Sequence, residues 1–472
     1  MFIRKSFMTC ALLLVMALPA VAQDPTPTDR APSYHQLARQ GRDLSMEDVA
    51  ALEVLVEETP SDLHARAKLI GYYGRKSYHD VGAEKTILPR RKHILWAIEN
   101  ASDSELCQLS ELSLKPAGNE LADPEGYEQA KALWLEQQAN HKDNGNVFAN
   151  SAMFFVFYDK DLASEALVRA QSLDPDNPNW QRLQGMVYAM GILGITGTNP
   201  NGIPTAHDPE QMTSETAKRF RQELEETTNP RVLSAAAMIL FKSGSMVEMV
   251  VRTEGTSEAL DLPEKLELSE KLLKRAQSLD PEMAVQYEQM LGMLYQYKAM
   301  MAKGEEEKQK ATDQAIDAKK QAAESSRSEK EAMVLLLDLM QEEFKAGRLD
   351  EARINAHKVL ELALSFEGEW FYGNAIQHGH RVLGHAALKN GQLGDAKEHL
   401  LASGRIDGGP SLSSFGPNMT LAKAMLEHGE KETVIDYLKL CKNFWDDIAK
   451  LDSWIRKINA GNTPNFGANL VY

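Results

Sequence analysis

Apolar positions along the chain recur mainly with helical spacing, and few runs alternate in the way that half-buried strands do. Within residues 144–177, Ala163 and Ala170 stand seven apart, with Leu167 between them. Two small residues on one helical stripe let a partner helix approach closely, and Leu167 then fills the groove between the helices. An Asp-Pro pair ending at Pro175 stops this helix and redirects the chain. The pattern predicts an all-α chain built from helix pairs.

One helix-turn-helix unit occurs twice. The segment Arg-Ala-Gln-Ser-Leu-Asp-Pro stands at 169–175 and again at 275–281. Each copy is followed by Gly-Met-aliphatic-Tyr, at 185–188 and at 292–295. The recurrence indicates a repeat architecture, in which each unit buries its apolar face against the next.

The two copies differ in length. Their Asp-Pro segments are 106 residues apart, whereas the helices that precede them are 85 residues apart, so the second copy has an insertion near 244–262. A second insertion, 191–209, is rich in Gly, Asn, Thr and Pro and predicts an irregular loop. Asn201 and Asp208 suggest calcium, but the alternating Asp/Asn ladder of a calcium loop is missing. We therefore predict no metal there.

The small residues, the Asp-Pro turn and the Gly-Tyr pairs together resemble the tetratricopeptide repeat (TPR) family. The resemblance implies an all-α, TPR-like solenoid of antiparallel helix pairs that binds a protein or peptide in a concave helical groove, without catalysis. It covers a block at 141–300 and a second block at 331–450. A weaker form of the same rhythm extends over 31–140.

The segment 301–330 separates the two blocks. From residue 302 onward its only apolar side chains are alanines and Ile316, so it is not expected to bury a face, although its composition favours helix. Two interpretations remain open: a solvated extension of one repeat helix, or a charged helical spacer about 43 Å long that joins the blocks. The end of the chain, 451–472, is expected to cap the last repeat with Phe466 and its neighbours.

Residues 1–22 have the features of a secretory signal peptide. Arg4 and Lys5 precede an apolar stretch, and a small-x-small site ends at Ala22. We expect cleavage after Ala22 and a periplasmic or secreted protein. Cys10 lies ahead of the apolar stretch, which disfavours a lipoprotein. No later apolar run reaches the ~18 residues of a membrane-spanning helix.

The charge composition of the chain argues against some classes of binding partner. The 68 acidic residues outnumber the 52 basic ones, which opposes a nucleic-acid backbone or an anionic membrane as a general partner. After signal cleavage only Cys107 and Cys441 remain, in different repeats, and we expect both to be free and buried.

Histidines gather between 357 and 428, and His378, His380 and His385 share one expected helix. None belongs to a His-Glu-x-x-His motif, and the first two point to different faces of that helix. Nucleophile-elbow, phosphate-loop and dinucleotide motifs are also missing, so we predict no catalytic residue, cofactor or metal. A metal-dependent hydrolase using the 378–399 histidines remains an alternative.

A basic stripe is the candidate ligand groove. His378, Arg381, His385 and Lys389 are spaced three, four and four apart, and Lys423 holds the corresponding position one repeat later. By resemblance to the TPR family these are first-helix positions that line the groove, and the ligand would be anionic, such as an acidic peptide or a chain-terminal carboxylate. The family's carboxylate clamps use Asn where His385 and Lys423 stand, so their specific chaperone-tail ligand is not supported.

Aromatic residues leave one further alternative. Trp370 with Phe371 and Tyr372 is the one cluster that resembles a sugar platform, and helix packing explains it equally well. A glycan- or nutrient-binding helical-repeat protein of an envelope uptake system is therefore the second interpretation. Such proteins are typically lipid-anchored, and the missing lipoprotein signal counts against it.

Overall fold

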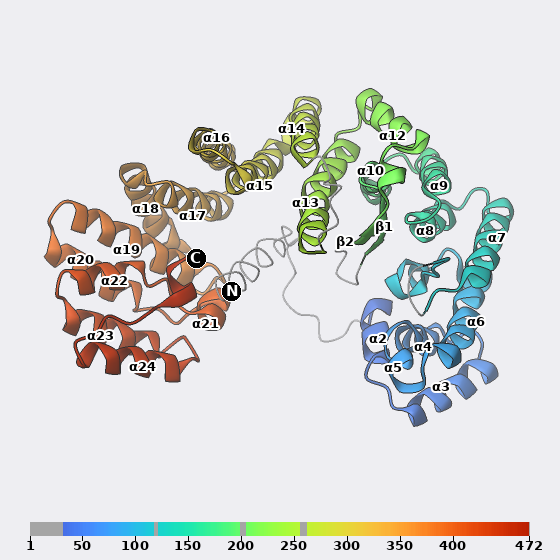
Figure 1. Cartoon of the computed structure of the whole chain (residues 1–472), viewed down its shortest axis with the longest axis horizontal. Helices are drawn as coiled ribbons and strands as arrows, with labels where there is room; N and C mark the ends of the chain where they lie inside the picture. The colour runs from blue at the N-terminus through green and yellow to red at the C-terminus, as the bar shows by residue number, and fades with distance from the viewer. Residues whose placement is uncertain (1–31, 118–120, 199–203, 255–261, 472) are drawn as a thin grey trace. The chain divides into compact units, whose positions relative to one another are not determined.

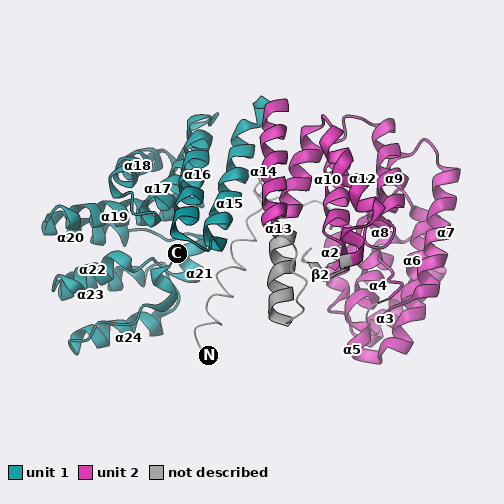
Figure 2. Ribbon diagram, turned by 45° about the horizontal axis from the view of Figure 1, so that its top comes forward, with its two compact units in different colours: residues 1–16, 280–472 teal, residues 17–279 magenta. Residues whose placement is uncertain are grey.

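The computed structural model describes residues 32–117, 121–198, 204–254 and 262–471. These residues form α-helices, a few 3-10 turns and a single two-stranded sheet (Figure 1). The described residues divide between two compact units, one within 17–279 and the other within 280–472 (Figure 2). The expected signal segment, 1–22, lies outside the described residues. In the parts that are described, no helix is both long and apolar enough to cross a membrane.

The unit at 17–279 is a succession of helices that pack on their neighbours in sequence. Its elements are α2 (Tyr34–Gly41), α3 (Met46–Glu58), α4 (Leu63–Arg75), α5 (Ser77–Val81), α6 (Ala83–Ala101), η1 (Glu105–Gln108), η2 (Ser110–Leu112), α7 (Pro124–Asn140), α8 (Gly145–Phe155), α9 (Lys160–Leu173), α10 (Pro178–Ile192), β1 (Ile195–Thr198), β2 (Pro204–His207), α11 (Pro209–Met212), α12 (Glu215–Glu226), α13 (Pro230–Glu254) and α14 (Leu262–Leu279).

The small residues of the repeat occupy the predicted places. Ala163 and Ala170 on α9 are wholly buried, and Leu167 between them is 1% exposed. On α10, a Cβ atom added to Gly185 would lie 2.3 Å from the carbonyl oxygen of Val232 on α13, so the close crossing of these helices requires glycine. The repeat residues therefore determine how closely the helices pack.

The described parts of both insertions contain regular structure. The stretch 191–209 was predicted to be irregular, which is wrong: β1 and β2 pair antiparallel, with Ile195 opposite His207, and Ile195 is fully buried. The β-branched residues of β1 favour this pairing. Asp208 caps α11 by accepting a hydrogen bond from the backbone N–H of Glu210. In the second insertion α13 continues to Glu254, so inserted residues lengthen a helix; 255–261 lie outside the described residues.

The described part of the second unit, 280–471, is built from four helix pairs, with the short helix α21 between the third and fourth pairs, followed by a final helix and a tail. Its elements are η3 (Pro281–Met283), α15 (Ala284–Met301), α16 (Glu305–Glu324), α17 (Glu329–Lys345), α18 (Leu349–Ala363), η4 (Leu364–Phe366), α19 (Tyr372–Lys389), α20 (Leu393–Ser403), α21 (Pro410–Phe415), α22 (Thr420–Glu427), α23 (Lys431–Cys441), α24 (Ile448–Asn459) and η5 (Gly467–Leu470). Helices α15, α17, α19 and α22 are the first helices of the pairs.

The charged segment 301–330 was predicted to bury no face, and this prediction is wrong. Most of it is α16, which packs between α15 and α17 and is neither a solvated extension nor a free spacer. Alanines at helical spacing, together with Ile316, form its buried stripe. Lys319 is 5% exposed and its Nζ lies 3.0 Å from Asp338 and 3.2 Å from Glu342. Alanine side chains let α16 pack closely against its neighbours even though it has few large apolar residues, and the hydrophobic pattern alone did not indicate this.

The tail docks on the last helices. The Phe466 ring is 1% exposed and lies 4.9 Å from the Trp454 ring of α24. The backbone N–H of Met419 donates to the carbonyl oxygen of Asn469 at 2.7 Å.

Cys107 and Cys441 are both free and buried, and burial raises the pKa of each thiol.

Candidate functional site

The first-helix layer of the 280–471 unit contains most of the predicted stripe. Helix α19 contacts α17 and α22, the first helices on either side, and also α18 and α20. Apolar and small residues at helical spacing, such as Ala375 and Val382, bury most of its circumference. Because neighbouring helices pack on several sides of α19, its buried polar side chains lie in seams between helices.

The five stripe residues do not form one exposed surface. Arg381 is 3% exposed, and His378 and His385 are largely buried as well. Lys389 and Lys423 are exposed at the surface, where they form ion pairs with Asp350 at 3.5 Å and with Glu427 at 2.9 Å. Four of the five lie on α19, as their spacing predicted, and Lys423 lies on α22. The spacing could not show that neighbouring helices cover the first three.

Arg381 is the most unusual of these residues. Its guanidinium lies over the Phe344 ring of α17, 4.8 Å from the ring centroid. Its Nε and Nη2 atoms are buried and have no hydrogen-bond partner, and no carboxylate of the described residues forms an ion pair with it. Burial lowers the pKa of Arg381 to about 10, although the nearby Tyr437 opposes this. A buried charge without a counter-ion is costly, because water no longer solvates it.

The two histidines that flank Arg381 on α19, His378 and His385, do not supply the missing counter-ion. The His385 Nε2 atom lies 3.2 Å from the Thr420 hydroxyl, and burial beside Arg381 lowers the pKa of His385 to about 4. The His378 Nδ1 atom has no partner, and burial followed by the charges of Arg381 and Lys345 holds the pKa of His378 far below its ordinary value. Both imidazoles are therefore neutral near pH 7, and the local potential comes from Arg381.

His380 lies on a different face of α19 and meets His399 of α20. The Nδ1 atoms of His380 and His399 are 3.1 Å apart, so the two rings share a hydrogen bond between α19 and α20. Burial lowers the pKa of His380 to about 4. Within the described ranges no group of three or more His, Cys, Asp or Glu side chains is arranged to hold a metal. The 378–399 histidines are thus divided: His378 and His385 lie beside Arg381 on α19, whereas His380 pairs with His399 of α20.

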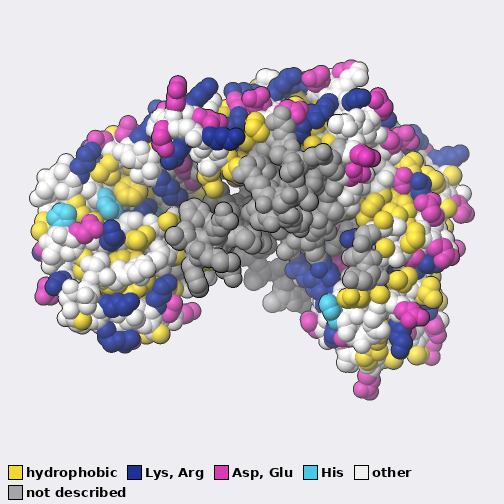
Figure 3. Space-filling model, viewed as in Figure 1, with side chains coloured by type: hydrophobic (Ala, Val, Ile, Leu, Met, Phe, Trp, Pro, Cys, Tyr) yellow, Lys and Arg dark blue, Asp and Glu magenta, His cyan; other side chains and the backbone are white. Residues whose placement is uncertain are grey.

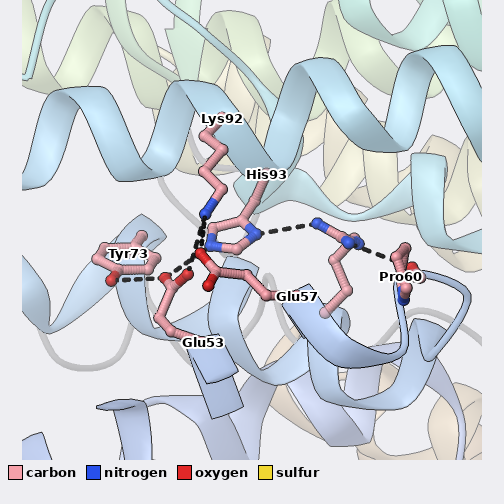
Figure 4. Close-up of polar contacts among 7 residues, drawn as sticks. Glu53, Glu57, Pro60, Tyr73, Lys92 and His93 are labelled. Atoms are coloured by element: carbon pink, nitrogen blue, oxygen red, sulfur yellow. Dashed lines mark hydrogen bonds and ion pairs between the residues drawn. The ribbon is translucent and has the colours of Figure 1, made fainter. Parts of the chain in front are cut away.

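A second buried polar network lies in the 17–279 unit and was not found from the sequence. Glu53 of α3 accepts hydrogen bonds from the Tyr73 hydroxyl and from His93 Nε2, both at 2.8 Å (Figure 4). The His93 Nδ1 atom lies 3.1 Å from Arg66 Nη1. Burial opposes ionisation of Glu53, but hydrogen bonds and charge from His93, Tyr73 and Lys92 outweigh it and lower the pKa of Glu53 to about 2.

This network holds α3, α4 and α6 together. Arg66 Nη2 donates to the Pro60 carbonyl oxygen at 3.2 Å, and the guanidinium stacks 3.5 Å above the Trp96 ring. A shallow cleft of about 410 Å³ lies beside it. Glu53 provides a carboxylate close to Arg66, with His93 between them. The contrast with Arg381 is clear, because Arg66 has a counter-ion nearby.

On the face shown in Figure 3, basic and acidic side chains of the described residues are mixed. The aromatic cluster is also divided: Trp370 is 60% exposed, whereas Phe371 is 1% exposed and packs in the core. The three aromatic residues therefore do not form a continuous platform.

Comparison with known proteins adds little to this description. No protein-family model and no curated protein matches the sequence. The similar solved structures include a human IFIT1 dimer with m7Gppp-AAAA, which is 17% identical and has a TM-score of 0.31, with 92% of this chain and 91% of that chain covered. Another is the P58(IPK) TPR domain, which is 12% identical and has a TM-score of 0.19, with 71% and 94% covered. Likeness this low assigns neither a family nor a ligand. The helix pairs of the chain itself show the fold, which is an all-α, TPR-like stack of antiparallel helix pairs.

Proposed function

We propose that this chain is an exported, non-catalytic scaffold that binds a protein or peptide through the first-helix layer of its 280–471 unit. The partner presents an anionic group that pairs with Arg381. One observation supports this site above the others, namely a guanidinium that is 3% exposed and has no anionic partner. Proteins usually pair a buried charge, so an unpaired one marks a place where a ligand can supply the missing anion.

The orientation of the free donors specifies the anion. Nε and Nη2 are the unpartnered nitrogens of Arg381, and they form one edge of the planar guanidinium. That edge donates two parallel hydrogen bonds, a geometry that suits a carboxylate or a phosphate. Because the edge is covered, the partner reaches it by displacing side chains at the seam between α17 and α19. Rearrangements of this kind are common in regulatory complexes.

The remaining stripe residues have supporting roles. Lys389 and Lys423 are exposed and give the surrounding surface positive charge, although each already pairs with an acidic neighbour. Exposed pairs of this kind contribute little energy and are easily exchanged for a partner's carboxylate. The neutral His378 and His385 provide hydrogen-bonding groups beside the anion.

The site can be tested with succinate and inorganic phosphate as small anionic probes. Added to the purified protein from residue 23 onward, a bound anion should stabilise the wild type by about 1.4 kcal/mol at ten times its dissociation constant, and the melting temperature should rise. The Arg381→Met variant should show no such rise, whereas the control Lys439→Ala, which removes an exposed charge of α23 outside the site, should respond as the wild type does. An equal rise in Arg381→Met, or no rise in the wild type with either anion, would reject the anion site.

A further inference from the structure

Four basic side chains gather where α2, α4 and α6 pack together in the 17–279 unit. Arg42 follows α2, Arg75 ends α4, Arg90 lies within α6, and Lys115 lies in the loop that leads to α7. These four residues are called the basic row below. The sequence pattern did not indicate the row, because its members are far apart in the chain.

One carboxylate holds two members of the row. Glu111 of η2 is 6% exposed, and its Oε1 atom lies 2.6 Å from Arg42 Nη2 and 3.9 Å from Arg75 Nε. A Cβ added to Gly74 would lie 2.8 Å from the Glu111 side chain, so glycine at that position lets Glu111 pack against α4. Burial and then the charge of Arg42 lower the pKa of Arg75, although Glu111 opposes this. The two guanidiniums therefore converge on one fixed point.

Arg90 and Lys115 extend the row. Arg90 is 7% exposed, its Nη2 atom donates to the Ser113 carbonyl oxygen, and its Nε atom is buried without a hydrogen-bond partner. Burial, followed by the positive charges of Arg90 and Arg75, lowers the pKa of the Lys115 ammonium. Lys115 is therefore close enough to both arginines to be repelled by them.

The row carries more positive charge than its surroundings neutralise. Its four cations share the one carboxylate of Glu111, which leaves three positive charges. Asp123 also acts on Arg90, but its two carboxylate oxygens both accept hydrogen bonds from Arg91 and so already have a cation. In a chain with 68 acidic and 52 basic residues, this local excess runs against the overall charge.

Helix ends explain only part of the row. Arg42 and Arg75 lie at the C-termini of α2 and α4, where the helix dipole favours a cation. Arg90 lies inside α6 and Lys115 lies outside any helix, so neither gains from a dipole. Among the described residues, the side chains of Arg75 and Lys115 donate no hydrogen bond, and both are partly exposed. Their donors are therefore available to a ligand.

From these contacts we infer that the basic row binds a diphosphate, that is, two joined phosphoryl groups, either free or at the end of a small molecule. One phosphoryl group pairs with Arg42 and Arg75, and the other pairs with Lys115, with the buried charge of Arg90 behind it. Arginine forks suit phosphoryl oxygens, which accept several hydrogen bonds at once. A single phosphoryl group carries only about −1.5 to −2 charge, so two joined groups match three positive charges more closely.

This site is in a different unit from Arg381 and does not depend on the proposed function. Succinate and orthophosphate, the probes of the Arg381 site, carry at most about two charges and reach only part of the row. We therefore expect both to bind the row at least tenfold more weakly than a diphosphate does.

Titration calorimetry on the Arg381→Met protein from residue 23 onward measures this site alone. The probes are pyrophosphate, adenosine diphosphate, orthophosphate and succinate, at low salt and without divalent metal ions, because salt screens such charges. At least one of the two diphosphates should bind tenfold or more tighter than orthophosphate and succinate. Tighter binding of pyrophosphate would support the free anion as the ligand, and tighter binding of adenosine diphosphate would support a diphosphate ester.

Lys115→Gln and Arg75→Gln should each weaken binding of the tighter diphosphate at least tenfold, because each removes a charge that faces the ligand. Lys271→Gln is the matched control: it removes the same charge from an exposed lysine of α14 in the same unit, and its affinity should stay within twofold. Lys115 belongs to a loop and donates no side-chain hydrogen bond, so its replacement should leave the fold intact, which a thermal melt checks.

Three results would overturn the inference: neither diphosphate binds, orthophosphate binds as tightly as both, or Lys115→Gln binds as tightly as Lys271→Gln. Hexaglutamate serves as the competing ligand, since an acidic peptide is also attracted to a row of cations. Tighter binding of that peptide than of either diphosphate would contradict a diphosphate site as well. Because every titration uses Arg381→Met, failure of this site leaves the Arg381 proposal open to its own test.

Discussion

Replacing Arg381 by Met should make the free protein more stable, which is the opposite of what removal of a structural arginine does. The side chain is 3% exposed and has no counter-ion among the described residues. Met fills much of the same volume with a flexible, apolar side chain and retains contact with the Phe344 ring. The variant therefore removes an unfavourable buried charge while keeping most of the packing.

The size of the effect follows from two opposing contributions. Burial lowers the pKa of Arg381 to about 10, which corresponds to a desolvation cost of about 3 kcal/mol relative to its ordinary value in water. The guanidinium gains about 1 kcal/mol from the Phe344 ring 4.8 Å away, and the variant loses this. The net expectation is a stabilisation of about 2 kcal/mol. For a unit of this size that raises the melting temperature by about 4–8 °C.

Differential scanning calorimetry of the wild type and the variant measures this directly. Lys319→Met in the same unit is the matched control, because Lys319 is equally buried but lies 3.0 Å from Asp338 and 3.2 Å from Glu342. Removing the Lys319 charge leaves the largely buried Glu342 carboxylate without its cation, whereas Asp338 is exposed to water, and should destabilise the unit by about 2 kcal/mol. If Arg381→Met also destabilised the protein by more than about 1 kcal/mol, Arg381 would be a structural residue and the reasoning from its missing counter-ion would fail.

Three further predictions concern other parts of the chain. Glu53→Gln should destabilise the 17–279 unit by about 2 kcal/mol in urea unfolding at pH 7, because His93 and Tyr73 lose a charged acceptor. The pKa of Glu53 is lowered to about 2 in the folded protein. The stability that the Glu53 carboxylate contributes should therefore be complete above about pH 4.5 and disappear as the pH falls toward 2. Equal unfolding midpoints of variant and wild type at pH 7 would contradict this. Burial lowers the pKa values of His380 and His385 to about 4 in the folded protein, so between about pH 6.5 and 4 the unfolded chain binds protons that the folded chain does not. The 280–471 unit should therefore lose stability as the pH falls through this range. A urea unfolding midpoint that stays constant over the same range would argue against neutral buried histidines. Mass spectrometry of the protein from its native cells should find Gln23 at the N-terminus, and an intact Met1 would refute the proposed export.

Local spacing predicted the helix pairs well because close helix crossings require small residues. Ala163 and Ala170 are wholly buried in the predicted positions. The same rule explains the error at α16, where alanine stripes pack as closely as larger apolar residues do, and a hydrophobicity pattern counts them as weak. The strand pair β1 and β2 was missed because each strand is only four residues long, too short for an alternating pattern to be recognised.

The candidate site was predictable in part. The spacing of His378, Arg381 and His385 placed them on one face of α19, but their burial depends on which helices pack against that face. Phe344 reaches Arg381 from the preceding pair and Thr420 reaches His385 from the following one. Contacts of this kind join distant residues and leave no periodic trace in the sequence. The hydrogen bond from Asn469 of the tail to the Phe415 carbonyl oxygen was not predicted for the same reason, since the two residues are 54 positions apart in the chain.

The most direct test of the scaffold proposal is the affinity of a natural partner. Crosslinking in the native cells, followed by purification of the captured protein or peptide, provides the ligand for titration against the wild type, Arg381→Met and Lys389→Ala. Loss of a bidentate, buried ion pair should weaken binding at least tenfold in Arg381→Met, whereas Lys389→Ala, which removes an exposed charge, should stay within about threefold of the wild type. Equal affinity of the wild type and Arg381→Met for every captured partner would contradict the proposed function.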